Sequence, residues 1–279
     1  INTISISSFE NNINLVKQNN NYISESGYPL KKGLWENLIT SLSLLRIEEL
    51  KTNDPIRHAQ LNLLLPEQNK SKDEDDGYGT KITLKKEDGT IYSSVLFGMV
   101  DRSVGGISGG QFARFPSEDQ TYLLKGAIRM PTTKSDWFES LLLSIKKNDV
   151  QKVSLNNKNG IIEILSKDDK LNLTIPENVK FDIDDTQLSD ARDIINSFYF
   201  YDVKKALRKY SENLPTLSFK VKDGLVITIS SINPDESGES WVLMNAMSNN
   251  SKSEKLAYEI NQKTKGYEFL ANIITSDIL

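Results

Sequence analysis

The most regular hydrophobic pattern of the chain lies between Tyr28 and Pro55. Gly27 and Pro29 turn the chain into this segment, and Asp54 ends it as the N-cap of a short second helix that begins at Pro55. Apolar residues recur between these signals at spacings of three and four, which places them on one face of a helix: Leu34, Trp35, Leu38, Ile39, Leu42 and Leu45. We therefore expect one amphipathic helix across the segment.

A second stretch, Phe181–Val203, repeats this apolar pattern with different polar residues. When Tyr28 is aligned with Phe181, Trp35 falls on Leu188 and Leu42 falls on Ile195. Three short alternating runs, typical of strands, precede each stretch: residues 4–6, 13–15 and 22–24 in the first half, and 153–155, 161–165 and 171–175 in the second. The shared order predicts an internal duplication.

These patterns predict an α+β fold, a duplicated unit of mostly antiparallel twisted sheet with a packed helix. Hairpins are expected at Asp88-Gly89 and Asp223-Gly224. A linking helix is expected over Thr133–Lys147, with Thr133 and Asp136 as a capping box and Trp137 on its apolar face. The predicted domains are a first repeat over residues 1–130, the linking helix over 131–148, and a second repeat over 149–279.

Composition narrows the function classes. The net charge of -4 gives no sign of a nucleic-acid-binding protein. The chain has no cysteine, which excludes disulfides, thiolate metal sites and cysteine nucleophiles, and one histidine, which excludes a multi-histidine metal site within one chain. No apolar run approaches the ~20 residues that span a bilayer. Because Ile1 already stands in a strand-like run, we expect that an N-terminal piece has been removed.

One motif resembles that of a serine hydrolase. Gly106-Ile107-Ser108-Gly109-Gly110 matches the G-x-S-x-G elbow, which needs a strand before the serine and a helix after it. Residues 111–115 predict a strand instead, and His58 lies upstream of the serine, whereas the triad order puts the histidine last. We interpret the motif as a flexible hairpin loop. A Ser-Lys mechanism stays open, although no lysine is placed to support it. His58 itself is expected at the surface or half-buried.

Two acidic runs are candidate calcium sites. A calcium loop needs oxygen ligands at alternating positions and a glycine at the sixth. Counting back from Gly77 puts Lys72 at the first position, and the run Asp182–Asp185 has Gln187 where the glycine should be. Such acids more commonly favour a helix N-terminus. We therefore assign no metal, no cofactor and no catalytic residue.

Two long polar segments of the first half, Glu67–Gly79 and Asp101–Gly110, are expected to be exposed loops that contact a partner. Arginines beside a loop can bind an anionic group, and the alternative is a solvated hairpin end. The candidate partner-binding residues are Asp101, Arg102, Arg114, Asp73 and Asp75. Among the aromatic residues, Trp35 and Trp137 are expected in the core and Trp241 partly exposed, and Tyr199 and Tyr201 could line a sugar groove.

Several short motifs together resemble a known family. They are Gly27-Tyr28-Pro29, Lys51-Thr52-Asn53-Asp54-Pro55, Asp88-Gly89, Phe97-Gly98, Phe112-Ala113-Arg114, Thr121-Tyr122-Leu123 and Asp136-Trp137. In this order they resemble the bacterial family filed as domain of unknown function 4340, best between Tyr28 and Val153. The chain departs from the family in its lysine- and acid-rich run from Asn69 to Asp76.

The resemblance implies a periplasmic or other extracytoplasmic protein, held to the inner membrane by one N-terminal anchor. Members are often encoded beside ABC-type transporters of the gliding-motility kind, so transporter subunits are the implied protein partners. The family offers no catalytic residues to transfer. We expect a non-catalytic accessory or scaffold domain of an envelope transport or motility-related complex, not an enzyme. The alternatives are a glycan- or lipid-binding module and, last, a hydrolase that uses Ser108.

Overall fold

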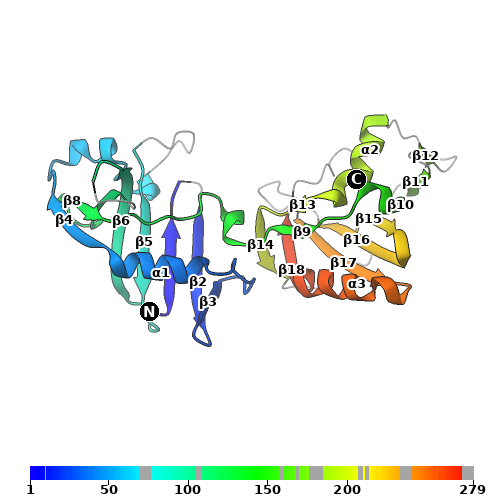
Figure 1. Ribbon diagram of the computed structural model, residues 1–279, viewed down its shortest axis with the longest axis horizontal. Coiled ribbons are helices and arrows are strands. Elements are labelled where there is room, and N and C mark those ends of the chain that lie inside the picture. Colours follow the sequence, from blue (N-terminus) through cyan, green and yellow to red (C-terminus); the bar gives the residue numbers. More distant parts are fainter. Residues whose placement is uncertain are drawn as a thin grey trace. The chain divides into compact units, whose positions relative to one another are not determined.

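The chain folds into two units, Ile1–Phe138 and the unit that begins at Glu139 (Figure 1). The computed structural model describes residues 1–9, 11–68, 77–104, 109–157, 160–167, 170–175, 185–206, 210, 214–232 and 241–271. Each unit is built around one large antiparallel sheet of eight strands.

The first unit has strand order β3-β2-β1-β5-β6-β7-β8-β4. Its strands are β1 (Thr3–Ser7), β2 (Asn12–Gln18), β3 (Asn21–Ser24), β4 (Arg46–Leu50), β5 (Thr80–Lys85), β6 (Ile91–Asp101), β7 (Gly110–Arg114) and β8 (Thr121–Lys125). Three short 3-10 turns, Pro55–Arg57, Ala59–Leu61 and Pro66–Gln68, follow β4. The predicted N-cap is confirmed, since the Asp54 carboxylate accepts a hydrogen bond from the N–H of Ile56 at 3.1 Å.

The second unit has strand order β12-β11-β10-β15-β16-β17-β18-β14. Its strands are β10 (Val150–Asn157), β11 (Gly160–Lys167), β12 (Lys170–Thr174), β14 (Asp202–Lys205), β15 (Thr216–Val221), β16 (Leu225–Ile232), β17 (Trp241–Ser248) and β18 (Tyr267–Leu270). The short strands β9 (Leu141–Leu143) and β13 (Phe198–Tyr199) pair with each other beside this sheet.

The two strand orders correspond position by position. In each unit three strands form a meander, the next strand of the large sheet lies at the far edge (β4 and β14), and four strands fill the space between. This shared order is what a structural repeat requires. The units also differ, because a helix stands between β17 and β18 but not between β7 and β8.

The predicted α+β class is wrong, because the fold is mostly antiparallel β-sheet with short helices. The described residues contain α1 (Leu34–Leu44), α2 (Asp185–Asp193) and α3 (Ser251–Thr264). The long helix expected up to Pro55 ends early, because Leu45 takes an extended conformation (φ -61°, ψ 139°) and the chain continues as β4. The described part of the second apolar stretch, Phe181–Val203, likewise contains only a short helix, α2, which is followed by a 3-10 turn at Ile194–Asn196 and by strands.

The linking helix predicted over Thr133–Lys147 does not form. Lys134–Trp137 is a single 3-10 turn, Leu141–Leu143 is strand β9, and Lys147–Asp149 is another 3-10 turn. The capping pair is present, since the N–H and hydroxyl of Thr133 both donate to the Asp136 carboxylate. Extended backbone at Phe138 (φ -121°, ψ 161°) stops the turn from growing into a helix. The boundary between the two units in the sequence therefore falls between Phe138 and Glu139, and not at a linking helix.

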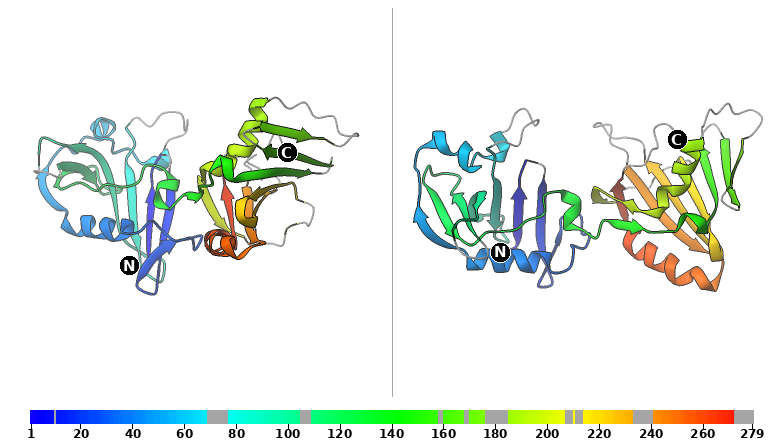
Figure 2. Two further views of the ribbon diagram at one scale, coloured as in Figure 1. Left: turned by 45° about the vertical axis from the view of Figure 1, so that its right-hand side comes forward. Right: turned by 45° about the horizontal axis from the view of Figure 1, so that its top comes forward.

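In the first unit, α1 and the segment after β8 lie on one face of the sheet (Figures 1 and 2). Trp137 is buried there, as predicted, beside Phe138 and Tyr28. Trp35 is only half-buried, with its ring 5.3 Å from that of Tyr22 on β3. Leu38 is the only buried residue of α1, so this helix buries little of its surface against the sheet.

In the second unit, α3 packs against β16 and β17 and buries Ala257 and Ile260 (Figure 2). Trp241 at the start of β17 is buried, which corrects the expectation that it is partly exposed. The Lys204 ammonium lies 3.7 Å from the centre of its ring and makes a cation–π contact.

Candidate functional site

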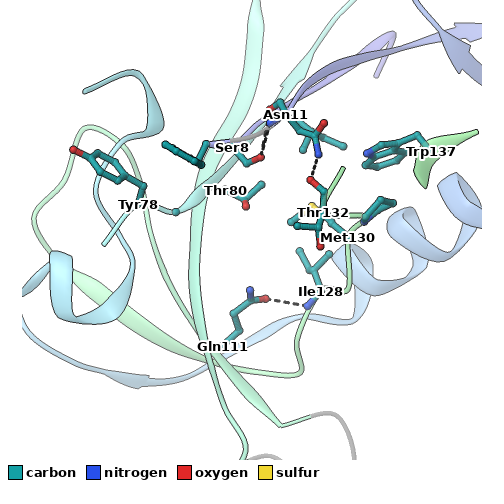
Figure 3. A pocket seen from close by; sticks show the side chains of 13 residues that line it. Ser8, Asn11, Tyr78, Thr80, Gln111, Ile128, Met130, Thr132 and Trp137 are labelled. Atoms are coloured by element: carbon teal, nitrogen blue, oxygen red, sulfur yellow. Dashed lines mark hydrogen bonds between the residues drawn. The ribbon is translucent and has the colours of Figure 1, made fainter. Parts of the chain in front are cut away.

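Two hollows of the first unit are candidate binding sites, and the first is a polar pocket of about 240 Å³ (Figure 3). The turn between β1 and β2, the start of β5, strand β7 and the segment after β8 meet around it. Their polar contributions are Ser8, Asn11, Tyr78, Thr80, Gln111 and Thr132, and Figure 3 shows these side chains around the pocket. We call this the polar pocket.

A buried glutamine joins two parts of the polar pocket's wall. The side-chain amide of Gln111 donates to the carbonyl oxygen of Gly98 at 3.0 Å and accepts from the N–H of Ile128 at 2.9 Å. Gln111 therefore ties β7 to β6 and to the segment after β8. Because each amide atom makes one hydrogen bond within the fold, these bonds fix the side chain in the wall of the pocket.

Asn11 has a less complete set of hydrogen bonds. Its backbone N–H donates to the Ser8 hydroxyl at 3.1 Å, and its side-chain nitrogen donates to the carbonyl oxygen of Thr132. Its side-chain oxygen is buried and has no hydrogen-bond partner among the described residues. Among the described residues that line the pocket, Tyr78 is the only ionisable one, so this described lining can form hydrogen bonds but offers no acid–base pair.

The second candidate, which we call the apolar hollow, has a volume of about 290 Å³. It lies between the C-terminal half of α1, strand β4 and the middle of the sheet. Leu42 and Leu45 line it from the helix side, with Ile47 from β4. The sheet contributes a mostly apolar floor that includes Leu84, Val95, Phe97, Ala113 and Leu124.

Exposed apolar side chains lie on the elements that form the apolar hollow or directly beside them. Leu44 and Ile47 are 67% and 60% exposed, and Leu50 and Phe115 are also exposed. All five residues of the edge strand β4 are exposed. Exposed apolar side chains that gather on neighbouring elements often mark an interaction site.

Of the predicted partner-binding residues, Asp101 ends β6 and Arg102 lies in the turn that follows it. The Asp101 carboxylate accepts hydrogen bonds from the N–H of Ser103 at 2.9 Å and from its hydroxyl at 2.6 Å. Both hydrogen bonds lower the pKa of Asp101 below its usual value, and the bond from the Ser103 hydroxyl has the larger effect. Arg102 is exposed, as the prediction required. Their role in partner binding stays a prediction.

Arg114 does not lie at a solvated hairpin end. It is only 6% exposed, and its guanidinium donates to the carbonyl oxygen of Leu63 at 2.9 Å. It also donates to the carbonyl oxygens of Phe115, Pro116 and Glu118 at 3.1 to 3.3 Å. Burial lowers the pKa of Arg114, while nearby Asp119 acts in the opposite direction. Arg114 thus fastens a loop through backbone carbonyls, and its role in partner binding stays a prediction.

The chain is similar to one known family. The chain matches the family described as Domain of unknown function (DUF4340) over residues 22–220, which is more than half of its length. The chain belongs to this family. No curated protein and no solved structure matches it. The family resemblance carried by the short motifs is confirmed, whereas the membrane anchor and the gene neighbourhood stay predictions.

The matched stretch of this DUF4340 protein contains every residue that lines the apolar hollow. It does not contain Ser8 or Asn11 of the polar pocket. Helix α3 of the second unit also lies beyond the matched residues. Of these two hollows of the first unit, the apolar hollow is therefore the one whose lining falls entirely within the part of the chain assigned to DUF4340.

His58 of this DUF4340 protein is buried, which corrects its expected place at the surface. Its ring nitrogen Nε2 lies 2.9 Å from the carbonyl oxygen of Asp119, so the histidine holds the same loop as Arg114. Asp73, Asp75, Ser108 and the acids Asp182–Asp184 lie outside the described residues. Within the residues that the structure does describe, no cluster of three or more histidine or acidic side chains could hold a metal ion. None of the helices found there has the length and apolar character of a membrane span.

A third hollow, in the second unit of the DUF4340 protein, bears on the predicted sugar groove. It is an open depression of about 390 Å³ beside α2 and β13. Tyr199 and Tyr201 line it and are half exposed, and Asp190 and Asp193 contribute carboxylates. The structure thus brings the two predicted tyrosines to one surface depression.

Sequence reasoning missed Asn11, Gln111 and Asn261, whose side-chain amides bond to the backbone. The only available signal is an amide residue at an otherwise apolar or turn position, and surface positions carry the same residue types. Their partners, Thr132, Ile128 and Ala246, lie in other elements and could not be paired by sequence spacing.

Proposed function

We propose that this protein is a non-catalytic, extracytoplasmic accessory domain of an envelope ABC-type transport complex and that it acts by binding other proteins. The observation that carries the proposal is the apolar hollow with its exposed border of Leu44, Ile47, Leu50 and Phe115. Soluble domains seldom leave a patch of this kind uncovered unless a partner covers it.

The side chains around both hollows of the first unit support binding rather than chemistry. Of the described residues that line the apolar hollow, only Arg46, Arg114 and Tyr122 are ionisable, and the Arg114 guanidinium is already bonded to four backbone carbonyls. Within the described part of the chain, neither lining contains the paired acid and base that a hydrolytic site uses.

The family resemblance supplies the proposed location and partner class. It implies anchoring to the inner membrane and neighbouring genes for ABC-type transporters. We therefore place the domain on the outer side of the inner membrane, in contact with transporter subunits. A motility-related complex belongs to the same proposal, because the implied transporters are of the gliding-motility kind.

The test is affinity purification of the natural gene product, produced at its own locus, from detergent-solubilised membranes. We expect ABC-transporter subunits to co-purify in fixed proportion. A variant with the exposed apolar border made polar, Leu44→Ser together with Ile47→Ser, should lose them. A variant changed at Tyr258, an exposed residue on α3, to Ser is the matched control and should retain them. Recovery of the protein without any transporter subunit would contradict the proposal.

One observation favours glycan binding as a second candidate. Tyr199 and Tyr201 flank a depression with carboxylates, and aromatic faces beside hydrogen-bonding groups suit a sugar ring. Titration with soluble peptidoglycan fragments, followed by tyrosine fluorescence, tests it. Saturable binding that Tyr199→Ala abolishes would support it, and unchanged fluorescence up to millimolar glycan would exclude it.

A further inference from the structure

We infer that the apolar hollow receives an amphipathic helix of the partner protein, in the position that α3 takes on the second sheet. This inference deepens the proposed function and rests on it, because it names what the partner inserts. It comes from comparing the two sheets, residue by residue, at the same place in their common strand order.

The hydrogen-bonding register defines which residues correspond. In the first sheet Ile4 pairs with Leu84, and in the second sheet Val153 pairs with Phe219. The next strand continues both rows, since Leu84 pairs with Ser93 and Phe219 with Ile227. One row further along, Ile82 pairs with Val95 and Leu217 pairs with Ile229. Leu84, Ser93 and Val95 therefore correspond to Phe219, Ile227 and Ile229.

The corresponding residues differ sharply in burial. Phe219, Ile227 and Ile229 are at most 2% exposed. Leu84, Ser93 and Val95 are only half-buried, and all three line the apolar hollow. The same part of the same kind of sheet is thus covered in the second unit and open in the first.

Helix α3 contributes the cover over β16, the strand that carries Ile227 and Ile229. It packs against β16 and β17 on the face that carries Ile227 and Ala246. The opposite face carries the exposed residues Asn245 and Met247, so α3 cannot lie there. In the first unit the connection between β7 and β8 is only residues 115–120, too short for such a helix. The first sheet lacks its own counterpart of α3.

The edge of the first sheet argues for a helix rather than an added strand. Strand addition needs a regular, unprotected edge. The pairing of β4 with β8 shifts register between Ile47 and Glu49, and acidic Glu48 and Glu49 both face solvent there. Irregular pairing and exposed charges of this kind are how proteins discourage edge-to-edge pairing. The hollow beside β4 instead accepts side chains from above the sheet, as a helix presents them.

Charge complementarity specifies the helix further. Arg46 lines the apolar hollow and stands directly opposite Lys125 on the neighbouring strand. Like charges in directly opposed positions destabilise a sheet. Neither residue forms an ion pair with a side chain in the described part of the chain. The partner helix is therefore expected to carry an apolar stripe for the hollow and an acidic residue that faces Arg46 and Lys125.

The test is site-specific photo-crosslinking in the natural membrane complex. The photoreactive residue p-benzoylphenylalanine replaces Val95 at the floor of the apolar hollow in the full-length protein. In a matched control it replaces Met247, which is exposed on the uncovered face of the second sheet. We expect a crosslink from position 95 alone, and mass spectrometry should place it in a partner segment with apolar residues at spacings of three and four. Crosslinking to an extended segment, to lipid or to a second copy of this chain would overturn the inference.

A charge swap separates this inference from the proposed function. Arg46→Glu together with Lys125→Glu should reduce the crosslink about tenfold, and a reciprocal acid-to-lysine change on the partner helix should restore it. If transporter subunits co-purify but no helical segment crosslinks to position 95, the helix inference fails while the proposed function stands. If no transporter subunit co-purifies at all, the proposed function itself fails.

Discussion

The side-chain amide of Asn261 on α3 bonds to both backbone groups of Ala246 on β17. The N–H of Ala246 donates to Oδ1 of Asn261 at 2.9 Å, and Nδ2 of Asn261 donates to the carbonyl oxygen of Ala246 at 2.7 Å. Strand β18 pairs with β17 only at Trp241 and Val242. Asn261 therefore satisfies edge groups that β18 does not reach, and it holds α3 against the sheet.

This relationship predicts a large effect of Asn261→Ala. Ala246 is buried, so its N–H and C=O would lose their partners without gaining water. We expect the free energy of unfolding to fall by about 2 to 3 kcal/mol in urea denaturation. Gln262→Ala, at the exposed neighbouring position, should change it by less than about 0.5 kcal/mol. Equal losses in the two variants would show that the pair does not hold α3.

Arg114 should behave as a structural residue. Arg114→Met preserves much of its length but leaves four backbone carbonyls without their donor. We expect a loss of about 3 kcal/mol in the free energy of unfolding. The exposed residue Arg102 supplies the control, and Arg102→Met should cost less than about 0.5 kcal/mol. A stable Arg114→Met protein that fails to bind its partner would restore Arg114 as a contact residue.

Gly98 on β6 has no room for a side chain. A Cβ atom there would clash with the carbonyl oxygen of Leu61 and lie 2.9 Å from that of Asn62. Because these are backbone atoms of the segment that covers the sheet, relief requires the segment to move. Gly98→Ala should therefore lower the free energy of unfolding by about 3 kcal/mol. Met99→Ala at the exposed neighbouring position is the comparison, and a loss no greater than that of Met99→Ala would refute the tight contact.

The turn at Asp101 predicts a defined pH dependence. Its pKa is lowered by the Ser103 hydroxyl and N–H, so the bonds stabilise the folded state above the unfolded pKa, and that stability is lost as pH falls through the folded pKa. Carbon-detected NMR titration should find the midpoint of Asp101 below 3.8, the ordinary pKa of an aspartate side chain, and Ser103→Ala should raise it towards that value. Asp88, which makes the same pair of bonds with Thr90, is the internal control and should not move. If Ser103→Ala leaves the titration midpoint of Asp101 unchanged, the turn is not formed in solution.

The sequence allowed the strands to be predicted better than the helices. Alternating runs such as those around Ile4 and Ile162 appear as strands, because period-two patterns correspond directly to a sheet with one buried face. The stripe after Gly33 contains a helix only to Leu44. The last residue of the stripe, Leu45, is already extended, and the apolar residues Ile47 and Leu50 beyond it belong to an exposed edge strand. Spacing alone cannot tell a continuing helix from an edge strand when apolar residues in the strand face solvent.

The candidate site was harder to predict than the fold. Val95 and Leu84 read as ordinary core residues of a hairpin, and nothing in their spacing shows that the helix covering their counterparts is missing. That information lies in the comparison of two connections, residues 115–120 and the stretch that contains α3. The burial of Arg114 and His58 could not be predicted for a related reason, because each bonds to a backbone carbonyl that is distant in the sequence, that of Leu63 for Arg114 and that of Asp119 for His58.

Filling the apolar hollow tests the central claim most directly. The double variant Ser93→Ile with Val95→Phe places larger apolar side chains where the second sheet has Ile227 and Ile229. Quantitative co-purification from membranes is measured beside the melting temperature, with Met247→Phe as control. We predict that the double variant keeps or raises its melting temperature, because it fills space, and recovers about tenfold fewer transporter subunits. A folded double variant that recovers transporter subunits at the level of the control would contradict the account.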